Sequence, residues 1–305
     1  MTSAVHLAVL GLLLAAQLVL PAFHHGMLAR VMILATYATG YNLLLGYTGL
    51  MSLGHAMLFA TGMYATGLTV HRLGFGAAAG FAAGVVASVV VSAGVGLVAL
   101  RTSGSAFLIV TLMLSQAFYL ATLHFNEITQ GDQGFIVSGD LPAAFSTPLV
   151  KYNLAWLVLA LGLLLTLGLV RSPIGRVLQA LRENEERTRL LGYNTFAYKL
   201  LALVVSGGIS GVAGSTYALA FSYVGSSFAG ILYSIYPLLW TLLGGAGTAL
   251  GPLVGTLVMT YVVDVSSGLT AGYLLVVGAV LIFVILWAPA GIVGAVRARW
   301  AAWLP

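Results

Sequence analysis

Few residues of a type that could do chemistry stand inside the apolar segments of this sequence. The main ones are Asn42, His55, Gln116 and Asp264. His55 could relay a proton or bind a metal, but no histidine or carboxylate follows it three or four residues later. A lone histidine of this kind more often packs inside a bundle or lies in a loop, so the sequence predicts no metal site.

Covalent catalysis finds no support in the residue pattern. The chain has no cysteine, which removes disulfides, thiolate catalysis and cysteine-ligated metal. It also lacks a Ser, His and acid set, a phosphate-binding Gly-x-x-x-x-Gly-Lys loop and an acid pair deep in an apolar segment. We therefore expect no catalytic residue, no cofactor and no enzymatic activity.

Charge is concentrated in one segment, Arg171 to Lys199, which reads RSPIGRVLQALRENEERTRLLGYNTFAYK. It holds six of the twelve Lys and Arg residues and three of the seven acids. Ser172 can cap a first helical turn, Pro173 suits the first helical position, and Gly192 suits the left-handed position after a last turn. This pattern predicts a single helix from Pro173 to Leu191.

The predicted helix has one apolar and one charged face. Its apolar residues recur at the spacing of one helical face: Ile174, Val177, Leu178 and Leu181. Glu183 with Arg187, and Glu185 with Arg189, stand four apart with the acid first, which is the better order for a helical ion pair. Such a helix lies along a membrane surface or docks in a partner's groove. A solvated loop that only orients the protein fits the composition equally well.

The composition defines the environment of the whole chain. It is 60% hydrophobic and 6% charged, whereas about a quarter of the residues are charged in an ordinary soluble domain. The fold class is therefore an all-α polytopic membrane protein, with the lipid bilayer as a partner. The net charge of +5 is no nucleic-acid signal, because the basic residues gather in one loop and the C-terminal tail. The 38 glycines indicate tight helix packing and some broken helices.

Apolar stretches of about the 20 residues needed to cross a bilayer follow one another along the chain. They are Val5–Leu20, Met27–Leu45, Leu50–Val70, Phe75–Leu100, Ala106–Leu123, Tyr152–Val170, Leu200–Phe221, Tyr233–Val263 and Thr270–Trp287. The first is predicted to be a retained span, because no basic residue precedes it and the following chain is itself membrane-embedded. We expect about 8 to 10 transmembrane helices in a single transmembrane domain, residues 1–305, that contains the charged loop 171–199.

The distribution of basic residues orients the chain. The segment His124 to Lys151 has one Lys, against six Lys and Arg in the loop 171–199, which places the latter in the cytoplasm. Arg297 and Arg299 in the tail should be cytoplasmic as well. An even number of crossings must separate these two basic parts, yet three apolar stretches lie between them. The long stretch Tyr233 to Val263 should therefore break at its glycines and proline, namely Gly244, Gly245, Gly247, Gly251 and Pro252.

This break has a counterpart early in the chain. LLLGYTGLMSLGH, from Leu43 to His55, resembles LLGGAGTALGP, from Leu242 to Pro252, with its glycines in matching order. Coincidence in a Gly-rich chain is the alternative explanation. Paired Gly-interrupted segments are the best sequence indication of a substrate path through a membrane protein. The residues that we predict to lie on such a translocation path are Asn42, Gly46, Gly49, His55, Gly244, Gly247 and Pro252. Whether the repeat is inverted or parallel stays open.

Four motifs carry a resemblance to a known family. They are NLLLGYTGLMSLGHAMLFATGMYA, ITQGDQGF, the loop that begins SPIGRVLQALRENEERTRLLGYN and continues to STYAL, and LLGGAGTALGPLVG. In this order they resemble the LivM-type permeases of branched-chain amino acid ABC transporters, over most of the chain from Asn42 to about Ala290. The resemblance implies a multi-pass permease of the bacterial cytoplasmic (inner) membrane. It also implies its partners: a homologous second permease, two ATP-binding cassette ATPase subunits and an extracytoplasmic solute-binding protein.

The resemblance gives the charged loop a role. Permeases of ABC importers couple to the ATPase through a cytoplasmic Glu-Ala-Ala segment followed by a Gly. Here Glu186 stands six residues before Gly192, and Arg187 and Thr188 replace the two small residues. By this resemblance the residues expected to couple to the ATPase are Arg176, Arg182, Glu183, Glu186, Arg189 and Gly192.

The mechanism implied is alternating access driven by ATP on partner subunits, with the Gly-interrupted segments offering helix ends to a zwitterionic, apolar amino acid. The alternative is a secondary transporter of a small polar or zwitterionic solute, driven by an ion gradient. It would need carboxylates deep in the bundle, whereas the acids here stand in loops or near span ends. A structural membrane subunit is a further alternative. The substrate stays open among Leu, Ile, Val, other amino acids, urea and small amides.

Overall fold

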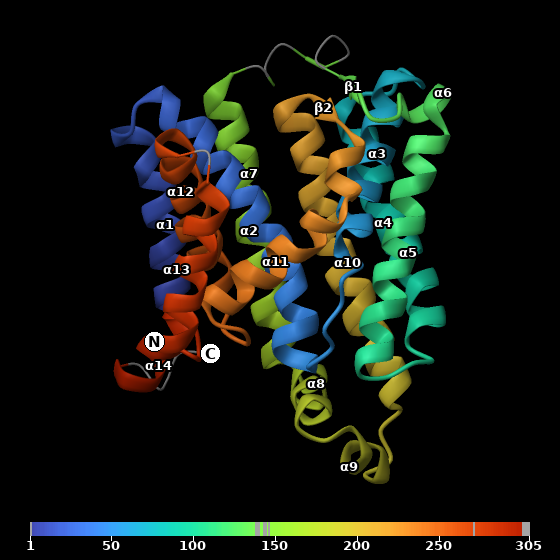
Figure 1. The fold of residues 1–305 in the computed structure, drawn as a ribbon, viewed down its shortest axis with the longest axis vertical. Helices are drawn as coiled ribbons and strands as arrows, with labels where there is room; N and C mark the ends of the chain where they lie inside the picture. Colours follow the sequence, from blue (N-terminus) through green and yellow to red (C-terminus); the bar gives the residue numbers. More distant parts are fainter. Residues whose placement is uncertain (1, 138–140, 143–144, 146, 271, 301–305) are drawn as a thin grey trace.

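The computed structural model describes residues 2–137, 141–142, 145, 147–270 and 272–300, and its elements are almost all helical (Figure 1). In chain order they are α1 Thr2–Val19, α2 Ala22–Thr48, α3 His55–His71, α4 Ala77–Ala99, α5 Ser105–His124, α6 Asn126–Thr129, β1 Phe135–Ile136, α7 Pro148–Arg171, α8 Pro173–Glu183, α9 Glu185–Leu190, α10 Thr195–Phe221, β2 Tyr223–Val224, the 3-10 helix η3 Ser226–Ala229, α11 Ile231–Gly244, α12 Gly251–Leu269, α13 Tyr273–Trp287 and α14 Ile292–Trp300. The all-α fold class is confirmed.

Six of these helices are long and apolar enough to cross a membrane. They span His24–Thr48, Ala77–Ala99, Ser105–His124, Pro148–Arg171, Thr195–Phe221 and Gly251–Leu269. Three shorter apolar helices are found at Val5–Val19, Ile231–Gly244 and Leu274–Val284. The described chain therefore has the helix content of a multi-pass membrane protein, in agreement with its hydropathy.

The bundle has two distinct ends. Figure 1 shows α8, α9 and α14 together at its lower end, which we call the basic end. The short elements α6, β1 and β2 lie at the upper end, the loop end. Arg297 belongs to α14, so the charged loop and the basic tail lie at the same end, as the distribution of Lys and Arg predicts.

The predicted break in the long apolar stretch is confirmed. The helix α11 ends at Gly244 and α12 begins at Gly251, with Gly245 and Gly247 at positive φ between them (120° and 78°). Glycine tolerates this part of conformational space and Pro252 suits a first helical turn, so both residue types act as the sequence indicates.

Small residues let the central helices α2, α3, α4 and α10 approach closely. A methyl group placed on Gly62 of α3 would lie 2.3 Å from the Gly211 carbonyl oxygen of α10, and one on Gly214 would lie 1.9 Å from the Phe59 oxygen. A methyl group on Gly84 of α4 would meet the Ser215 hydroxyl at 2.2 Å. Because lipid gives helices no hydrophobic drive to associate, such backbone approach supplies much of their attraction.

Two predicted helix boundaries were wrong. The helix expected from Pro173 to Leu191 is divided into α8 and α9 at Asn184, whose backbone is extended (φ −161°). The Arg187 N–H donates to Asn184 Oδ1 at 2.8 Å, so this residue caps a new helix instead of continuing the old one. The span expected from Leu50 begins only at His55, because Gly49 (φ 74°) ends α2 and a non-helical stretch follows.

The ion pairs of the charged loop also differ from the prediction. Glu185 pairs with Lys199 of α10, and Glu186 pairs with Arg189 at 3.8 Å, three residues later. Because Asn184 interrupts the helix, Glu183 and Arg187 on its two sides no longer share the regular four-residue spacing. Glu185 and Arg189 both lie in α9, but the Glu185 carboxylate is paired with Lys199 instead. Gly192 takes the predicted left-handed conformation (φ 89°) after α9.

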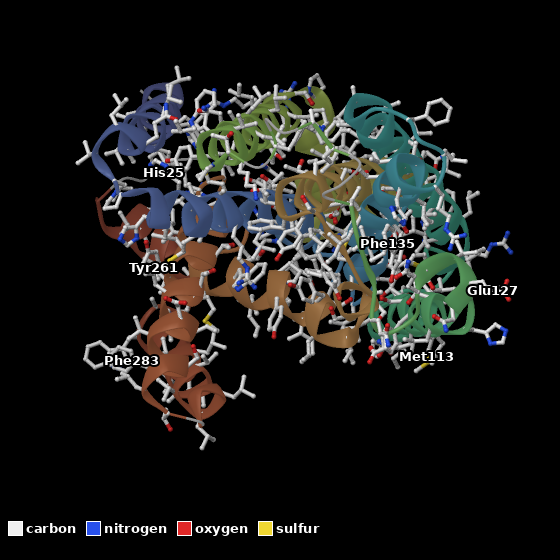
Figure 2. The ribbon with its side chains drawn as sticks, turned by 90° about the horizontal axis from the view of Figure 1, so that it is seen from above. His25, Met113, Glu127, Phe135, Tyr261 and Phe283 are labelled. Carbon is white, nitrogen blue, oxygen red and sulfur yellow. The ribbon has the colours of Figure 1, made fainter. Side chains whose placement is uncertain are left out.

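The helix α13 stands beside the bundle, whereas α12 packs on α11, where a methyl group on Gly255 would lie 1.9 Å from the Trp240 oxygen. Figure 2, seen from above, shows Phe283 projecting away from the main body and Tyr261 closer to it. Large exposed apolar side chains of α13 include Leu274, Leu275, Ile282, Phe283, Leu286 and Trp287. An apolar surface of this extent must face lipid or another membrane subunit.

Candidate functional site

The two Gly-interrupted segments meet inside the protein. Gly46, in the last turns of α2, lies against Gly247 in the break between α11 and α12: a methyl group on Gly46 would be 2.4 Å from the Gly247 nitrogen. Gly49 and Gly247, matched in the repeat, share nearly the same positive φ (74° and 78°). The structure thus brings together two glycines about 200 residues apart that sequence reasoning assigned to one path.

Asn42 connects α2 to the break between α11 and α12 through both the nitrogen and the oxygen of its side-chain amide. Its Nδ2 donates to the Thr248 carbonyl oxygen at 2.9 Å, and the Gly247 N–H donates to its Oδ1 at 2.9 Å. The side chain is fully buried. A peptide-like amide is the group best suited to satisfy a donor and an acceptor of unwound backbone, and at membrane depth such groups need protein partners.

The remaining residues predicted for the path stand at the ends of the broken helices. Gly244 closes α11 against the first turn of α12, where a methyl group would lie 1.8 Å from the Gly251 oxygen. Pro252 is buried in that turn. These positions leave no room for larger side chains, so they hold the two helix ends in contact.

His55 lies at the junction of α2, α3 and α10. Its Nε2 is 2.8 Å from the Ser206 hydroxyl, which donates to the Gly40 oxygen at 2.6 Å. Its ring packs edge-on against Tyr41 at 4.7 Å between centroids. Because Ser206 uses its proton on Gly40, it accepts the hydrogen bond from His55 Nε2. The geometry is that of a buried residue that fixes three helices.

The segment predicted to couple to the ATPase packs onto the same region. In α8, Val177, Leu178 and Leu181 are buried as the apolar face predicts, and Leu178 and Leu181 share a cluster with Leu43 and Leu44 of α2. The helix therefore rests on the end of α2 just beneath the glycine contact.

Arg182 connects α8 to both breaks. Its guanidinium donates to the Gly46 carbonyl oxygen, and its Nη1 would be 2.9 Å from a methyl group on Gly247. Its stem passes Gly49, where a methyl group would lie 3.2 Å from Arg182 Cγ. We call the contact of Gly46 and Gly247, with Asn42 and Arg182 bonded to it, the glycine junction.

The other predicted coupling residues face outward. Arg176, Glu183, Glu186 and Arg189 are exposed. The last residue of α9, Leu190, and the next residue, Leu191, are 81% and 71% exposed. Charged side chains around exposed leucines are typical of a surface that binds another protein.

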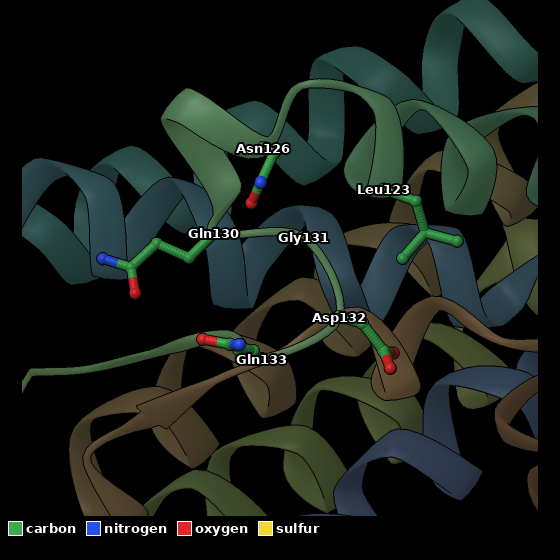
Figure 3. Close-up of a pocket in the computed structure, with 6 residues that line it drawn as sticks. All are labelled: Leu123, Asn126, Gln130, Gly131, Asp132 and Gln133. Atoms are coloured by element: carbon green, nitrogen blue, oxygen red, sulfur yellow. The ribbon is translucent and has the colours of Figure 1, made fainter.

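Sequence reasoning missed two features at the loop end. One is Arg30, a charged residue inside the span His24–Thr48; a basic residue within an otherwise apolar stretch was the available signal. The other is a surface pocket of about 470 Å³ formed by the motif ITQGDQGF and the end of α5. Figure 3 shows the polar ends of its side chains ranged along this loop: Asn126, Gln130, Asp132 and Gln133.

The loop with this pocket is fastened to the connection between α10 and α11. The strands β1 and β2 pair in antiparallel fashion, with Phe135 opposite Val224. The Tyr223 hydroxyl donates to the Gln133 oxygen at 3.1 Å, and the Ser226 hydroxyl donates to Asp132 at 3.3 Å. The two halves of the chain are therefore joined at the loop end as well as at the glycine junction.

Replacing Asn42 by Leu is expected to lower the free energy of unfolding by about 1–3 kcal/mol, because the Gly247 N–H and the Thr248 oxygen lose their partners. Thermal unfolding of the purified protein in detergent measures the effect. The matched control is Asn153→Leu, at an exposed position of α7, which should leave the melting temperature unchanged. Equal melting temperatures for both variants would contradict this role of Asn42.

Several apolar spans around an interior junction of unwound backbone, with a charged segment packed on it, define a multi-pass membrane permease. No catalytic arrangement is seen among the described residues, and none of their His, Asp and Glu side chains form a group that could hold a metal ion. The family model of the branched-chain amino acid transport system permease component matches residues 24–285, and the chain belongs to this family. It is a permease subunit of an ABC importer and, in bacteria, a protein of the inner membrane.

Curated relatives include both types of permease. The high-affinity branched-chain amino acid transport system permease protein LivM of Salmonella typhimurium is 26% identical over 87% of this chain and 69% of its own length. LivM of Escherichia coli K12 is 25% identical with the same coverage. LivH of Escherichia coli K12 is 25% identical over 85% of this chain and 91% of its own. Similarity to both types implies a second, homologous permease subunit. No solved structure matches the chain.

Proposed function

We propose that this chain forms half of the translocation path of an ATP-driven importer for branched-chain or closely related amino acids. ATP hydrolysis would occur on two ATP-binding cassette subunits docked at the basic end, and a solute-binding protein would deliver substrate at the loop end. The family match and the LivM and LivH relatives support the substrate class.

The observation that carries this proposal is the path of contacts through α8. Its outer continuation, α9, presents charged residues and the exposed Leu190 and Leu191. Its inner face packs on α2, and Arg182 bonds to Gly46 at the glycine junction. One short segment thus connects a surface suited to a partner protein with the contact between the end of α2 and the break at Gly247.

Alternating access follows from this arrangement. A partner that moves α9 displaces α8, and Arg182 transmits the displacement to the contact between Gly46 and Gly247. When these glycines separate, the basic end opens to the cytoplasm; when they meet, it closes. The loop-end pocket and the strand pair of β1 and β2 would form part of the surface that receives the binding protein.

We expect gentle extraction of the tagged chain from its native membrane to recover a second permease and ATP-binding cassette subunits. Mass spectrometry identifies them, and reconstituted vesicles that contain the complex should accumulate labelled leucine only with ATP and the binding protein. Extraction with a Leu190→Glu and Leu191→Glu variant should lose the ATPase subunits but keep the second permease.

Uptake that persists without ATP but stops when the proton gradient is collapsed would contradict this proposal and favour a secondary transporter. The structure gives that alternative little support: the acids described lie in the loops at either end, or, for Asp264, at an exposed position near the end of α12.

A further inference from the structure

Arg30 is a basic side chain within a helix that is long and apolar enough to cross a membrane. It stands eight residues after the first residue of α2, roughly 12 Å along the helix axis at about 1.5 Å per residue. The α2 segment around it is a candidate membrane span, and Arg30 itself is exposed on the surface of this subunit. A charged residue inside a span is costly and therefore usually faces a water-filled cavity or a functional partner.

Two tyrosines from other helices hold the guanidinium in place. The hydroxyl groups of Tyr217 in α10 and Tyr233 in α11 lie close enough to the Arg30 guanidinium to interact with it electrostatically. Tyr233 is itself fixed, because the Tyr37 hydroxyl donates to its carbonyl oxygen at 2.8 Å. Side chains of α10 and α11 thus meet Arg30 of α2, and they orient its guanidinium before a ligand binds.

Tyr217 and Tyr233 belong to a cluster of packed aromatic rings. Tyr217 and Tyr233 both pack on Phe228, with centroids 5.0 Å and 4.8 Å away. Phe59 contacts both tyrosines as well, at 5.9 Å and 6.0 Å. Such a surface gives an apolar side chain a large contact area at little entropic cost.

The positive charge of the Arg30 guanidinium is best stabilised by an anionic partner. Among the described residues, the structure shows no ion pair between Arg30 and a carboxylate. Two hydroxyl partners do not neutralise a guanidinium, and its planar fork matches a carboxylate in two parallel hydrogen bonds. The ligand that fits has a carboxylate and, next to it, an apolar side chain.

We propose that Arg30, oriented by Tyr217 and Tyr233, binds the carboxylate of an apolar amino acid at the loop-end half of the translocation path. This rests on the proposed function and specifies its substrate site. The same helix α2 carries Asn42 and Gly46, the latter 16 residues further on, roughly 24 Å away along the axis. The amino acid would thus bind on the loop-end side of the closed glycine junction, which opens after the carboxylate is bound.

The test measures amino-acid binding to the purified transporter complex in phosphatidylcholine nanodiscs, without the binding protein. Saturation-transfer NMR detects weak binding of leucine and of leucinamide, which keeps the side chain and lacks the carboxylate. Wild-type complex should bind leucine and bind leucinamide at least about tenfold more weakly. Arg30→Gln should lower leucine affinity to the leucinamide level, Arg30→Lys should restore part of it, and Tyr217→Phe should weaken it a few-fold.

The matched control is Arg101→Gln, at an exposed position in the turn between α4 and α5, which should bind leucine like the wild type. Unchanged leucine binding in Arg30→Gln, or no binding to the wild type, would overturn the inference. An equal loss of leucine and leucinamide binding would assign Arg30 a structural role. If Arg30→Gln lowers leucine binding only in nanodiscs that contain phosphatidylglycerol, the anion bound by Arg30 is a lipid phosphate. This result, like the equal loss of leucine and leucinamide binding, would refute the amino-acid site.

Uptake assays separate this inference from the proposed function. If the wild-type complex with binding protein and ATP accumulates no amino acid, the proposed function is wrong. If it accumulates leucine and Arg30→Gln does so at the same rate and with the same concentration dependence, only the carboxylate site is wrong.

Discussion

Replacing Gly46 by Ala is expected to abolish uptake and to destabilise the protein. The added methyl group would lie 2.2 Å from Asn42 Oδ1 and 2.4 Å from the Gly247 nitrogen. Both neighbours are fixed, because Asn42 is bonded to the backbone of Gly247 and Thr248. Overpacking of this kind costs about 1–3 kcal/mol or more, and it separates the two segments that must meet for the basic end to close. Uptake by reconstituted vesicles and thermal unfolding in detergent measure the two effects.

The control for this substitution is Gly168→Ala in α7, where a methyl group would meet no atom within 4 Å. Alanine favours the helix over glycine by up to about 1 kcal/mol, so this variant should transport normally and melt at the same or a higher temperature. If Gly46→Ala behaved like Gly168→Ala, the glycine junction would have no role in closing the path.

Reversing the charges of Arg182 and Glu186 together is expected to uncouple ATP hydrolysis from uptake while the chain stays in the membrane. The two residues lie at opposite ends of the proposed contact path: Arg182 bonds to Gly46 inside, and Glu186 is exposed on α9. Loss of about 1.4 kcal/mol of coupling free energy lowers transport about tenfold at unchanged hydrolysis. The ratio of leucine transported to ATP hydrolysed in vesicles is the quantity to measure.

Single substitutions then separate the two ends. Arg182→Ala should lower the transport ratio with ATPase subunits still bound, whereas Glu186→Arg should weaken their binding. Arg101→Ala, a loss of one exposed Arg in the turn between α4 and α5, controls for the change in charge. A transport ratio in the doubly reversed variant equal to that of the wild type would remove the coupling role of this segment.

Hydropathy and residue chemistry predict the elements of this protein well, because each span must bury its own backbone polar groups. The break after Gly244 followed from the number of crossings and from the clustering of Gly and Pro, and it is confirmed. The division at Asn184 could not be read from periodicity, since Asn fits the charged face of a helix and caps a new one equally well.

Contacts between distant segments are harder to predict. A short repeat matched Gly46 with Gly244 and Gly49 with Gly247, but the contact between Gly46 and Gly247 depends on how α2 packs against α11 and α12. The contact of Arg182 with Gly46 could not be inferred either, because Arg182 is an exposed basic residue on a charged loop and such a residue is expected to interact with solvent alone. Arg30 was overlooked since the apolar residues around it dominate any average taken over the length of a span.

The glycine contacts among α3, α4 and α10 also determine how motion can spread. With backbones touching at Gly62 and Gly214, these helices have no loosely fitted side chains in which a displacement could be absorbed, and close-packed interiors transmit strain. The helix α2 packs on the same body, where a methyl group on Gly40 would lie 2.9 Å from the Ser206 oxygen of α10, and it carries the glycine junction near one end and Arg30 near the other. A small shift of α2 at the basic end would then also move the proposed amino-acid site at Arg30, without any local refolding.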